Sequence, residues 1–328
     1  MKLLTINGYG YNLSVDGGRL EATNGHYYDR PRQTTKYRRK EIDFDKVVIT
    51  GNHGKLSVSA IKWIMRQKRD IAILDWNGRL VTSMSPVLAN QGLVKLAQYE
   101  ARNDPKKQVA IAKWLIRHKL EGSIRVLEWL KNHYSISGYE LDIFAKYLRE
   151  LESTISVSAV IRIESILSKN YWNILASVFD KKWEFLRRNY FDRKGTRDAD
   201  DPINALFNYG YSVLESECWK VVNIMGLEPY IGFIHKTHTD KAPLIYDLQE
   251  PFRWIIEMSI LKILYKKMVT KSDFITTDEG NVRLRPSAVK MVLDEIAKQF
   301  STKILYKGMK REWQTMIMLK TRELVHLF

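Results

Sequence analysis

The sequence predicts an α+β protein, with a small β-rich N-terminal domain at residues 1–85 followed by a larger all-α domain at residues 86–328. Three observations support this class. In the first 85 residues, apolar residues alternate with polar ones or form short β-branched runs, as in strands. After Ser85-Pro86, apolar residues recur every three or four positions instead, as on helices. A length of 328 residues also favours two domains over one.

The β-rich domain is expected to hold one helix among several short strands. The strands are expected at residues 3–6, 11–15, 46–50, 71–76 and 80–81. Asp16-Gly17-Gly18 and Asn77-Gly78 supply residues that tight turns between strands require. After Gly51, apolar residues recur at helical spacing from Val58 to Met65, which predicts a helix.

Long amphipathic helices are expected through the rest of the chain. Apolar residues repeat at helical spacing in residues 94–101, 109–116, 124–130, 140–151, 153–179, 202–225 and 247–267. Gly138 and Gly226 are expected to end two of these helices. A polar turn at residues 278–281 precedes two more helices.

The net charge of the chain is unusual. Lysine and arginine number 53 against 37 aspartate and glutamate residues, so the net charge is +16 and the pI is near 9.6. Such a surface attracts polyanions, of which nucleic acid is the commonest. An anionic membrane surface is the rival partner. The contents of 45% hydrophobic and 27% charged residues are otherwise ordinary for a globular protein.

No segment is typical of membrane insertion or export. No apolar run reaches the ~18 to 20 residues that a spanning helix needs. The N-terminal MKLLTINGYGYN has too short an apolar core for a secretory signal. The single cysteine, Cys218, excludes an internal disulfide and gives no cluster of metal-binding thiolates. The sequence therefore favours a cytoplasmic protein that does not enter a membrane.

Basic and aromatic residues alternate in residues 181–200. Guanidinium and ammonium groups bind phosphates, and aromatic rings can stack on unpaired bases, so this segment is a candidate for DNA binding. The alternative is a helix end with core aromatics and a solvated loop. The same choice, between a phosphate grip and a solvated loop, applies to the basic residues 30–40, and residues 270–328 are also basic. The side chains assigned to DNA binding are Lys181, Lys182, Arg187, Arg188, Arg193, Lys194, Arg197, Arg253, Arg283 and Arg285.

A candidate metal site lies in residues 226–253. His235 is followed by Asp247 and Glu250, which share a face if a helix begins near Asp247. An imidazole with carboxylate oxygens is a ligand set suited to Mn²⁺ or Mg²⁺. His238 competes with His235 for the ligand role, and spacing alone does not decide between them. A lone histidine is more often a structural group than a ligand, so that interpretation stays open for both.

A further carboxylate is expected, because three ligands rarely suffice for a hard cation. Glu164 is the best candidate, since it falls on an apolar stripe that runs from Val157 to Val178 at helical spacing. A carboxylate in an apolar face is costly unless it is paired, protonated or bound to metal. The alternatives are a structural salt bridge or a position at the edge of the stripe.

Another helix is expected to begin at Asp201-Pro202. Aspartate is a good N-cap, and proline is well tolerated at the first helical position. Asn204 lies in the first turn of this helix, where its position alone indicates a polar capping residue.

Several of these segments resemble one protein family. The runs DDPINALFNYGYSVLESE, GLEPYIGFIH, PLIYDLQEPFR and RIESILSKNYW look like motifs of the CRISPR-associated integrase, the first Cas protein family. LSVSAIKWIMRQKRDIAILDWNGRL and AQYEARNDPKKQVAIAKWLIRHKLEGSIRVL look like its N-terminal half, so the resemblance covers nearly the whole chain. Where many members have a glycine after the motif glutamate, this chain has Ser165.

The resemblance implies a catalytic site. By it, Glu164, His235 and Glu250 match the family's metal ligands, Asp247 matches a nearby acidic position, and Asn204 matches the asparagine of its DPxNAL motif. With Mg²⁺ or Mn²⁺, such an endonuclease joins the 3′-hydroxyl ends of foreign DNA fragments (protospacers) to a CRISPR repeat by transesterification. The family also implies a homodimer, and a heterohexamer with a small ferredoxin-like partner on double-stranded DNA.

Three other functions remain open from the sequence. One is the integrase of a casposon, a mobile element whose transposase belongs to the same enzyme class. The second is a metal-dependent nuclease that acts on branched DNA and cuts without joining strands. The third is a basic, non-catalytic scaffold that binds nucleic acid. Glu164 on an apolar stripe argues against the scaffold, because binding alone gains nothing from that costly position.

Overall fold

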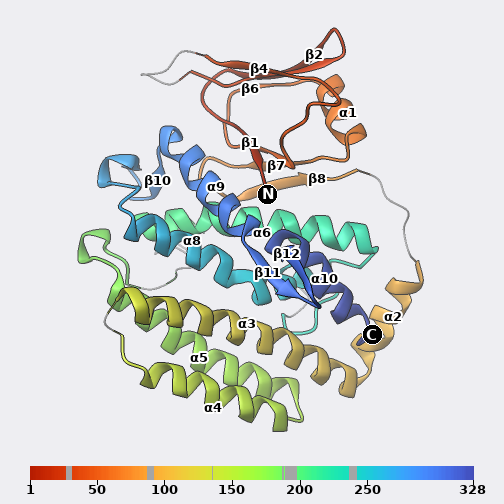
Figure 1. Ribbon diagram of the computed structural model, residues 1–328, viewed down its shortest axis with the longest axis vertical. Helices are drawn as coiled ribbons and strands as arrows, with labels where there is room; N and C mark the ends of the chain where they lie inside the picture. Colours follow the sequence, from red (N-terminus) through yellow and green to blue (C-terminus); the bar gives the residue numbers. More distant parts are fainter. Residues whose placement is uncertain (27–31, 87–91, 135, 187, 189–197, 236–241) are drawn as a thin grey trace. The chain divides into compact units, whose positions relative to one another are not determined.

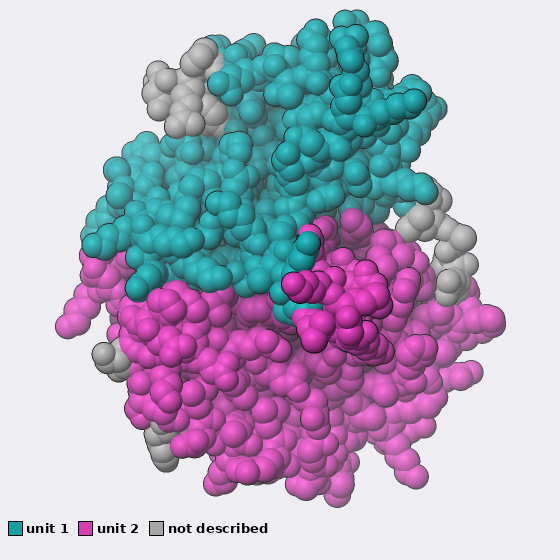
Figure 2. Space-filling model, viewed as in Figure 1, with its two compact units in different colours: residues 1–88, 189–216, 259–304 teal, residues 89–188, 217–258, 305–328 magenta. Residues whose placement is uncertain are grey.

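The computed structural model describes residues 1–26, 32–86, 92–134, 136–186, 188, 198–235 and 242–328. The chain divides into two compact units, each built from three segments (Figure 2). Unit 1 comprises residues 1–88, 189–216 and 259–304, and unit 2 comprises residues 89–188, 217–258 and 305–328. The predicted N-terminal domain therefore supplies only the first segment of unit 1.

The first segment of unit 1 folds into two four-stranded sheets (Figure 1). The strands are β1 (Leu3–Ile6), β2 (Tyr11–Asp16), β3 (Arg19–Thr23), β4 (Thr34–Tyr37), β5 (Lys46–Ile49), β6 (Gly54–Leu56), β7 (Asp70–Leu74) and β8 (Leu80–Met84). One sheet has the order β1-β5-β7-β8, with three parallel strands and an antiparallel β8. The other has the order β4-β3-β2-β6, in which β6 is parallel to β2. The strands predicted in this segment are confirmed.

Helix α1 (Val58–Arg66) completes the core of this segment. Ser57 caps the helix by accepting a hydrogen bond from the amide of Ala60. Trp63 and Ile64 on its buried face join strand residues such as Leu13 in one apolar cluster. The helix predicted after Gly51 is confirmed.

Two short hairpins interrupt the helices of the later chain. β9 (Phe274–Thr276) pairs with β10 (Val282–Leu284), and β11 (Lys303–Tyr306) pairs with β12 (Met309–Glu312). Gly280 and Gly308 have φ angles of 82° and 78° in the turns, a conformation that glycine adopts without strain. The second part of the chain is therefore not purely helical, although the predicted α+β class with a helical C-terminal part is confirmed.

The helices of the later chain match the predicted periodicities, except that residues 109–116 and 124–130 lie in one helix, which ends at His133, and Gly138 instead precedes the start of the next helix. They are α2 (Gly92–Asn103), α3 (Pro105–His133), α4 (Tyr139–Ser153), α5 (Val157–Val178), α6 (Pro202–Met225), α7 (Pro243–Gln249), α8 (Arg253–Tyr265), α9 (Pro286–Ser301) and α10 (Trp313–Val325), with 3₁₀ turns η1 (Lys181–Trp183), η2 (Glu250–Phe252) and η3 (Lys271–Asp273). In unit 2, α3 packs against α4, α5 and η2. Among the described helices, none is both long and apolar enough to cross a membrane.

The helix expected to begin near Asp247 begins one turn earlier. Pro243 occupies the first position of α7, where its missing N–H costs nothing. Asp247 consequently lies in the second turn of α7, and Glu250 opens the 3₁₀ turn η2, which leads directly into α8. The predicted start was wrong because Pro251, which is tolerated in η2, looked like a first-turn proline.

Candidate active site

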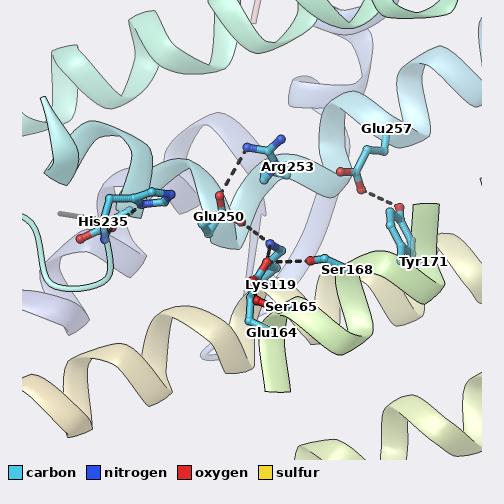
Figure 3. Close-up of polar contacts among 10 residues, drawn as sticks. Lys119, Glu164, Ser165, Ser168, Tyr171, His235, Glu250, Arg253 and Glu257 are labelled. Carbon is cyan, nitrogen blue, oxygen red and sulfur yellow. Dashed lines mark hydrogen bonds and ion pairs between the residues drawn. The ribbon is translucent and has the colours of Figure 1, made fainter. Parts of the chain in front are cut away.

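The ammonium group of Lys119 joins two carboxylates that come from separate elements of unit 2 (Figure 3). Lys119 lies near the middle of α3, Glu164 lies on α5, and Glu250 opens η2. Nζ of Lys119 is ion-paired with Oε1 of Glu164 and lies 2.7 Å from Oε2 of Glu250. The three side chains are 16%, 22% and 9% exposed, so the cluster is largely buried but reachable from solvent.

A close approach between two helices brings Lys119 to Glu250. A Cβ atom on Gly122, one turn after Lys119, would lie 2.3 Å from Cδ1 of Trp254 at the start of α8. Only glycine therefore allows α3 to pack this closely on the segment that follows Glu250. Because α3 also packs against α5, one face of α3 meets both carboxylates.

The charges in this cluster stabilise one another. Burial would raise the pKa of Glu250, but the positive charges of Lys119 and Arg253 outweigh burial and lower this pKa to about 2. Burial would lower the pKa of Lys119, but Glu250 and Glu164 raise it. Glu250 and Lys119 are therefore both charged at neutral pH. Arg253 contacts the other oxygen of Glu250, with 3.4 Å between Nη1 and Oε1.

Hydrogen bonds along α5 orient Glu164 and fix the helix. Ser168, one turn after Glu164, donates its hydroxyl to Oε1 of Glu164 at 2.6 Å. One turn further, the buried hydroxyl of Tyr171 donates to Oε2 of Glu257 on α8, also at 2.6 Å (Figure 3). Helix α5 is thus linked to the η2–α8 segment at two levels, through Lys119 and through Tyr171.

His235 and Asp247 form the other part of the candidate site. Nδ1 of His235 lies 2.7 Å from Oδ1 of Asp247, and the buried Asp247 carboxylate also accepts the backbone N–H groups of Phe233, Ile234 and His235. A carboxylate bound to Nδ1 fixes the ring and leaves Nε2 as the nitrogen that can bind a ligand. The side chain of His235 is 43% exposed, so Nε2 is accessible.

The two parts of the site interact electrostatically. Burial lowers the pKa of His235, but the hydrogen bond and the charge of Asp247 raise it, and the charge of Glu250 adds to the rise. The net shift is upward. Glu250 is therefore near enough to His235 to act on its proton affinity while it holds Lys119.

Gly232 lets the loop before His235 approach α7. A Cβ atom at this position would lie 2.8 Å from Cβ of Pro243 and 2.9 Å from Oδ2 of Asp247. Both contacts are closer than ordinary packing allows. Glycine at 232 is therefore needed for Asp247 to receive the three backbone N–H groups of the loop.

The side chains fit a divalent cation by their chemistry. Two carboxylates and an imidazole are donors that Mg²⁺ and Mn²⁺ accept. In the part of the chain that the structure describes, however, no three acidic, histidine or cysteine side chains form a ready-made metal-binding group. The ammonium of Lys119 holds the carboxylate oxygens of Glu164 and Glu250, and His235 is turned to Asp247. The predicted ligand set lies within unit 2, and its binding of metal stays a prediction.

Glu164 has features of both structural alternatives, a salt bridge and a position at the edge of the apolar stripe. The buried face of α5 is formed by Val160, Ile163, Leu167, Tyr171 and Leu175. Glu164 lies beside Ile163 at the edge of this face and is ion-paired, as a structural residue would be. What a plain salt bridge does not explain is the second carboxylate on the same ammonium group.

Asn204 lies in the first turn of α6, in unit 1. Its side chain is fully buried and donates to Asp201, whose carboxylate also accepts the backbone N–H of Asn204. The predicted N-cap of α6 at Asp201 is confirmed. Burial raises the pKa of Asp201 to about 7. These contacts are structural, and a catalytic role for Asn204 stays a prediction.

The residues assigned to DNA binding have different surroundings. Lys181 and Lys182 are exposed on η1, whereas the neighbouring Trp183 and Phe185 are buried, as the alternative of core aromatics predicted. Arg188 is half-buried. Four of the assigned residues and the rival histidine fall outside the described residues: Arg187, Arg193, Lys194, Arg197 and His238.

The three remaining arginines contact protein groups. Arg253 is 12% exposed and pairs with Glu250, so it belongs to the candidate site rather than to an open DNA-binding surface. In unit 1, the guanidinium of Arg283 lies 3.1 Å from the ring centroid of Trp76. Arg285 is exposed, and its Nε donates to the carbonyl of Ser272 at 2.8 Å. Of these three, only Arg285 is well exposed.

Sequence reasoning missed Lys119. A signal was present, because Lys119 recurs at helical spacing with buried residues of α3 such as Ile116, Ser123 and Val126. A lysine on one apolar stripe and a glutamate on another are complementary buried charges. Searching the apolar faces of the helices for polar side chains in this way also finds Tyr171 and Glu257, which lie on the buried faces of α5 and α8.

Comparison with known protein sequences gives matches over most of the chain. The profile of the family described as CRISPR associated protein Cas1 matches residues 4–298. The CRISPR-associated endonuclease Cas1 1 of Archaeoglobus fulgidus is 26% identical over 339 residues, which cover 98% of this chain and 95% of that protein. The protein of the same name from Methanospirillum hungatei JF-1 is 25% identical over 313 residues, covering 93% of this chain and 90% of its own.

Solved structures give matches over 99% of this chain. A casposase bound to its integration product has a TM-score of 0.90 and 34% identity, and 90% of that chain is covered. A Cas1 protein from Thermotoga maritima has a TM-score of 0.76, 17% identity and 96% coverage of that chain. A Cas6-RT-Cas1–Cas2 complex has a TM-score of 0.74 and 16% identity, with 35% of that chain covered. The last two identities are low, so these matches show the fold alone.

Proposed function

Because the chain belongs to the Cas1 family of CRISPR-associated proteins, we propose that it is a metal-dependent DNA integrase of CRISPR adaptation. Its reaction joins the 3′-hydroxyl ends of captured DNA fragments to a CRISPR repeat by phosphodiester transesterification. The name endonuclease, which the curated relatives carry, fits a protein that acts on phosphodiester bonds.

The observation that carries this proposal is the convergence of Glu164 and Glu250 on one cation. They come from different elements and share the ammonium of Lys119 in a largely buried place. An accessible imidazole, His235, is fixed beside them by Asp247. Paired carboxylates with an oriented histidine are a donor set that suits a divalent cation acting in phosphoryl transfer.

Each side chain has a distinct role in this reaction. The carboxylates of Glu164 and Glu250 and the Nε2 atom of His235 would hold Mg²⁺ or Mn²⁺. A bound ion of this kind lowers the pKa of an attacking hydroxyl and stabilises charge on the phosphoryl and leaving oxygens. Asp247 keeps the His235 ring in the tautomer that presents Nε2. Ser168 and Arg253 keep the two carboxylates oriented through their own contacts with them.

The proposed partners follow from charge and from the family. A net charge of +16 favours double-stranded DNA, both the protospacer and the CRISPR repeat, as the bound polyanion. The solved complex of a distant relative contains Cas1 and Cas2 in its name. We extend that pairing to this chain, as a cytoplasmic homodimer that forms a heterohexamer with a small ferredoxin-like partner.

A casposon integrase is the second candidate, and one observation favours it. The casposase is 34% identical to this chain, whereas the Archaeoglobus fulgidus endonuclease is 26% identical. Both candidates need the same site and the same strand transfer, so they differ in the DNA that is joined. A CRISPR integrase needs a repeat in the target, whereas a casposon integrase needs the terminal sequence of the mobile element on the donor.

A strand-transfer assay tests the proposal. The purified chain is mixed with a short duplex that has free 3′-hydroxyls and with supercoiled plasmids that carry or lack a CRISPR repeat. Mn²⁺, Mg²⁺ or EDTA is added, with and without the small partner protein. Joining that needs both metal and the repeat supports the first candidate, and joining that depends on casposon ends supports the second. Cutting without joining would indicate a nuclease, and binding without either reaction would indicate a scaffold.

A pair of matched variants ties the reaction to the candidate site. Glu164→Gln keeps the size of the side chain and the hydrogen bond from Ser168 but removes the charge. It should reduce strand joining more than about 100-fold, because loss of a metal ligand should cost more than loss of a residue that only hydrogen-bonds to a ligand. Glu152→Gln is the control, because Glu152 on α4 is exposed and pairs with Arg117 of α3 away from Lys119. Equal loss in both variants would contradict the site assignment.

A further inference from the structure

Two kinds of partner hold the carboxylates of the candidate site. Oε1 of Glu250 faces Arg253, three residues away on the continuing chain, and Glu164 receives the hydroxyl of Ser168 from its own helix. These partners are local and move with the carboxylates. Lys119 is different, because it comes from α3 and binds both carboxylates at once.

We propose that Lys119 is an internal counter-cation, which holds Glu164 and Glu250 together before a divalent cation binds and is displaced by that cation. The proposal rests on the metal-binding function proposed above. The ammonium contacts an oxygen of each carboxylate, and a divalent ion bound by both residues needs their oxygens too. The ammonium and the ion therefore compete for one place.

The need for a cation follows from the burial of the two carboxylates. Without Lys119, two carboxylates with 22% and 9% exposure would face one another with little water between them, and their charges would repel. The lysine removes this cost in the metal-free protein. A divalent cation carries twice the charge of the lysine ammonium and removes the same repulsion in the metal-bound protein. The two carboxylates therefore always have a cation between them.

Lysine is suited to leaving, whereas the other partners are suited to staying. The ammonium is a point charge on a flexible four-carbon stem, so it can turn away without movement of α3. Arg253 and Ser168 keep their contacts with Glu250 and Glu164 when this happens. The two carboxylates therefore remain oriented for the incoming ion, and Lys119 acts as a positioning residue.

The test compares Lys119→Met with Lys113→Met. The first variant keeps an apolar stem and removes the charge. The second removes a half-buried lysine on the same helix, whose Nζ donates to the carbonyl of Glu152 at 2.7 Å. Mn²⁺ binding is measured by calorimetry and by the electron paramagnetic resonance signal of free Mn²⁺. Thermal unfolding is measured in EDTA and in saturating Mn²⁺.

Lys119→Met should lower Tm in EDTA, and Mn²⁺ should remove most of this deficit. Mn²⁺ should bind Lys119→Met at least about tenfold more tightly than wild type, because no ammonium has to be displaced. Lys113→Met should behave as wild type in all measurements. A Tm deficit that persists in Mn²⁺, with unchanged or weaker Mn²⁺ affinity, would make Lys119 an ordinary structural ion pair and overturn the proposal.

A second variant covers the case in which Lys119→Met does not fold. Lys119→Arg keeps the charge, and its planar fork can pair with both carboxylates, so it should fold and bind Mn²⁺ more weakly than wild type. Mn²⁺ affinity equal to or above that of wild type would contradict the proposal. If the metal site itself were wrong, wild type would show no Mn²⁺ binding that Glu164→Gln abolishes, which separates that failure from a failure of Lys119 alone.

Discussion

Asp247 binds Nδ1 of His235 at 2.7 Å and also accepts three backbone N–H groups of the loop that carries this histidine. One buried carboxylate thus sets the ring orientation and the loop conformation together. A group with this many donors already bound is better suited to orient a ligand than to bind metal itself. In the proposed site, Asp247 therefore acts on metal through His235.

Asp247→Asn should weaken metal binding more than it weakens the fold. The amide keeps one accepting oxygen for the loop but presents an NH₂ group where Nδ1 of His235 now donates, so the ring loses its fixed tautomer. The Mn²⁺ Kd should rise about 10- to 100-fold, the usual cost of losing a partner of a ligating histidine. Calorimetry measures this, with the exposed Asp142→Asn on α4 as the control. An unchanged Kd would show that Asp247 serves only the loop.

Gly232→Ala should disturb the same loop by adding a methyl group between the loop and α7. The new methyl group would lie 2.9 Å from Oδ2 of Asp247 and 2.8 Å from Pro243, so the loop must move away from α7. Overpacking of this kind costs roughly 1–3 kcal/mol of unfolding free energy. Denaturant unfolding measures the cost, and Gly92→Ala at the start of α2, where a Cβ meets nothing within 4 Å, is the control. Strand transfer should fall in Gly232→Ala even at temperatures where it is fully folded.

Tyr171→Phe tests the second link between α5 and α8. The variant removes a hydroxyl that donates to Glu257 at 2.6 Å in a buried place, so the buried carboxyl group of Glu257 loses one donor. The cost should be about 1–3 kcal/mol, as for other buried acceptors that lose a donor. Tyr230→Phe, at a tyrosine that is 50% exposed, should cost almost nothing. Equal stability of the two variants in urea would mean that the Tyr171 hydroxyl does not help to hold α5 in place.

The sequence was sufficient to predict most of the helices and strands and to select the carboxylates and the histidine of the candidate site, but not Lys119. Strand alternation and helical spacing depend only on neighbours along the chain, so five of the eight described strands in residues 1–85 and the long helices could be predicted. The strands β3, β4 and β6 and the hairpins β9–β10 and β11–β12 were not predicted, because each of these strands has only three to five residues and lacks a β-branched run as long as that of β5. The start of α7 at Pro243 was missed for a similar local reason, since two prolines lie eight residues apart and either can open a helix.

The arrangement of the site depends on contacts that no local pattern contains. Glu164 could be selected because it is an isolated charge on an apolar stripe. That its partner is Lys119 follows from the close packing of Gly122 on Trp254, which joins residues far apart in the chain. The division of unit 1 into three separate segments has the same origin. Sequence reasoning thus finds charges that need partners, and the packing of helices decides which partners they receive.

The last prediction concerns pH and the N-cap of α6 in unit 1. Burial raises the pKa of Asp201 from an ordinary value of 3.8 to about 7. A carboxyl with a raised pKa binds its proton more tightly in the folded state than in the unfolded state. Its contribution to stability is therefore fully present below pH 3.8 and is lost as the pH rises through 7.

Asp201→Asn should remove this pH dependence while it keeps a good N-cap. Between pH 5 and pH 8, the unfolding free energy of wild type should fall relative to that of the variant by on the order of 2 kcal/mol, since one pKa unit corresponds to about 1.4 kcal/mol. Urea unfolding at several pH values measures the difference, and Asp278→Asn in an exposed turn is the control. Parallel pH profiles for wild type and Asp201→Asn would show that Asp201 is already ionised at pH 5. In that case, the hydrogen bonds from Asn204, rather than burial, would govern its charge.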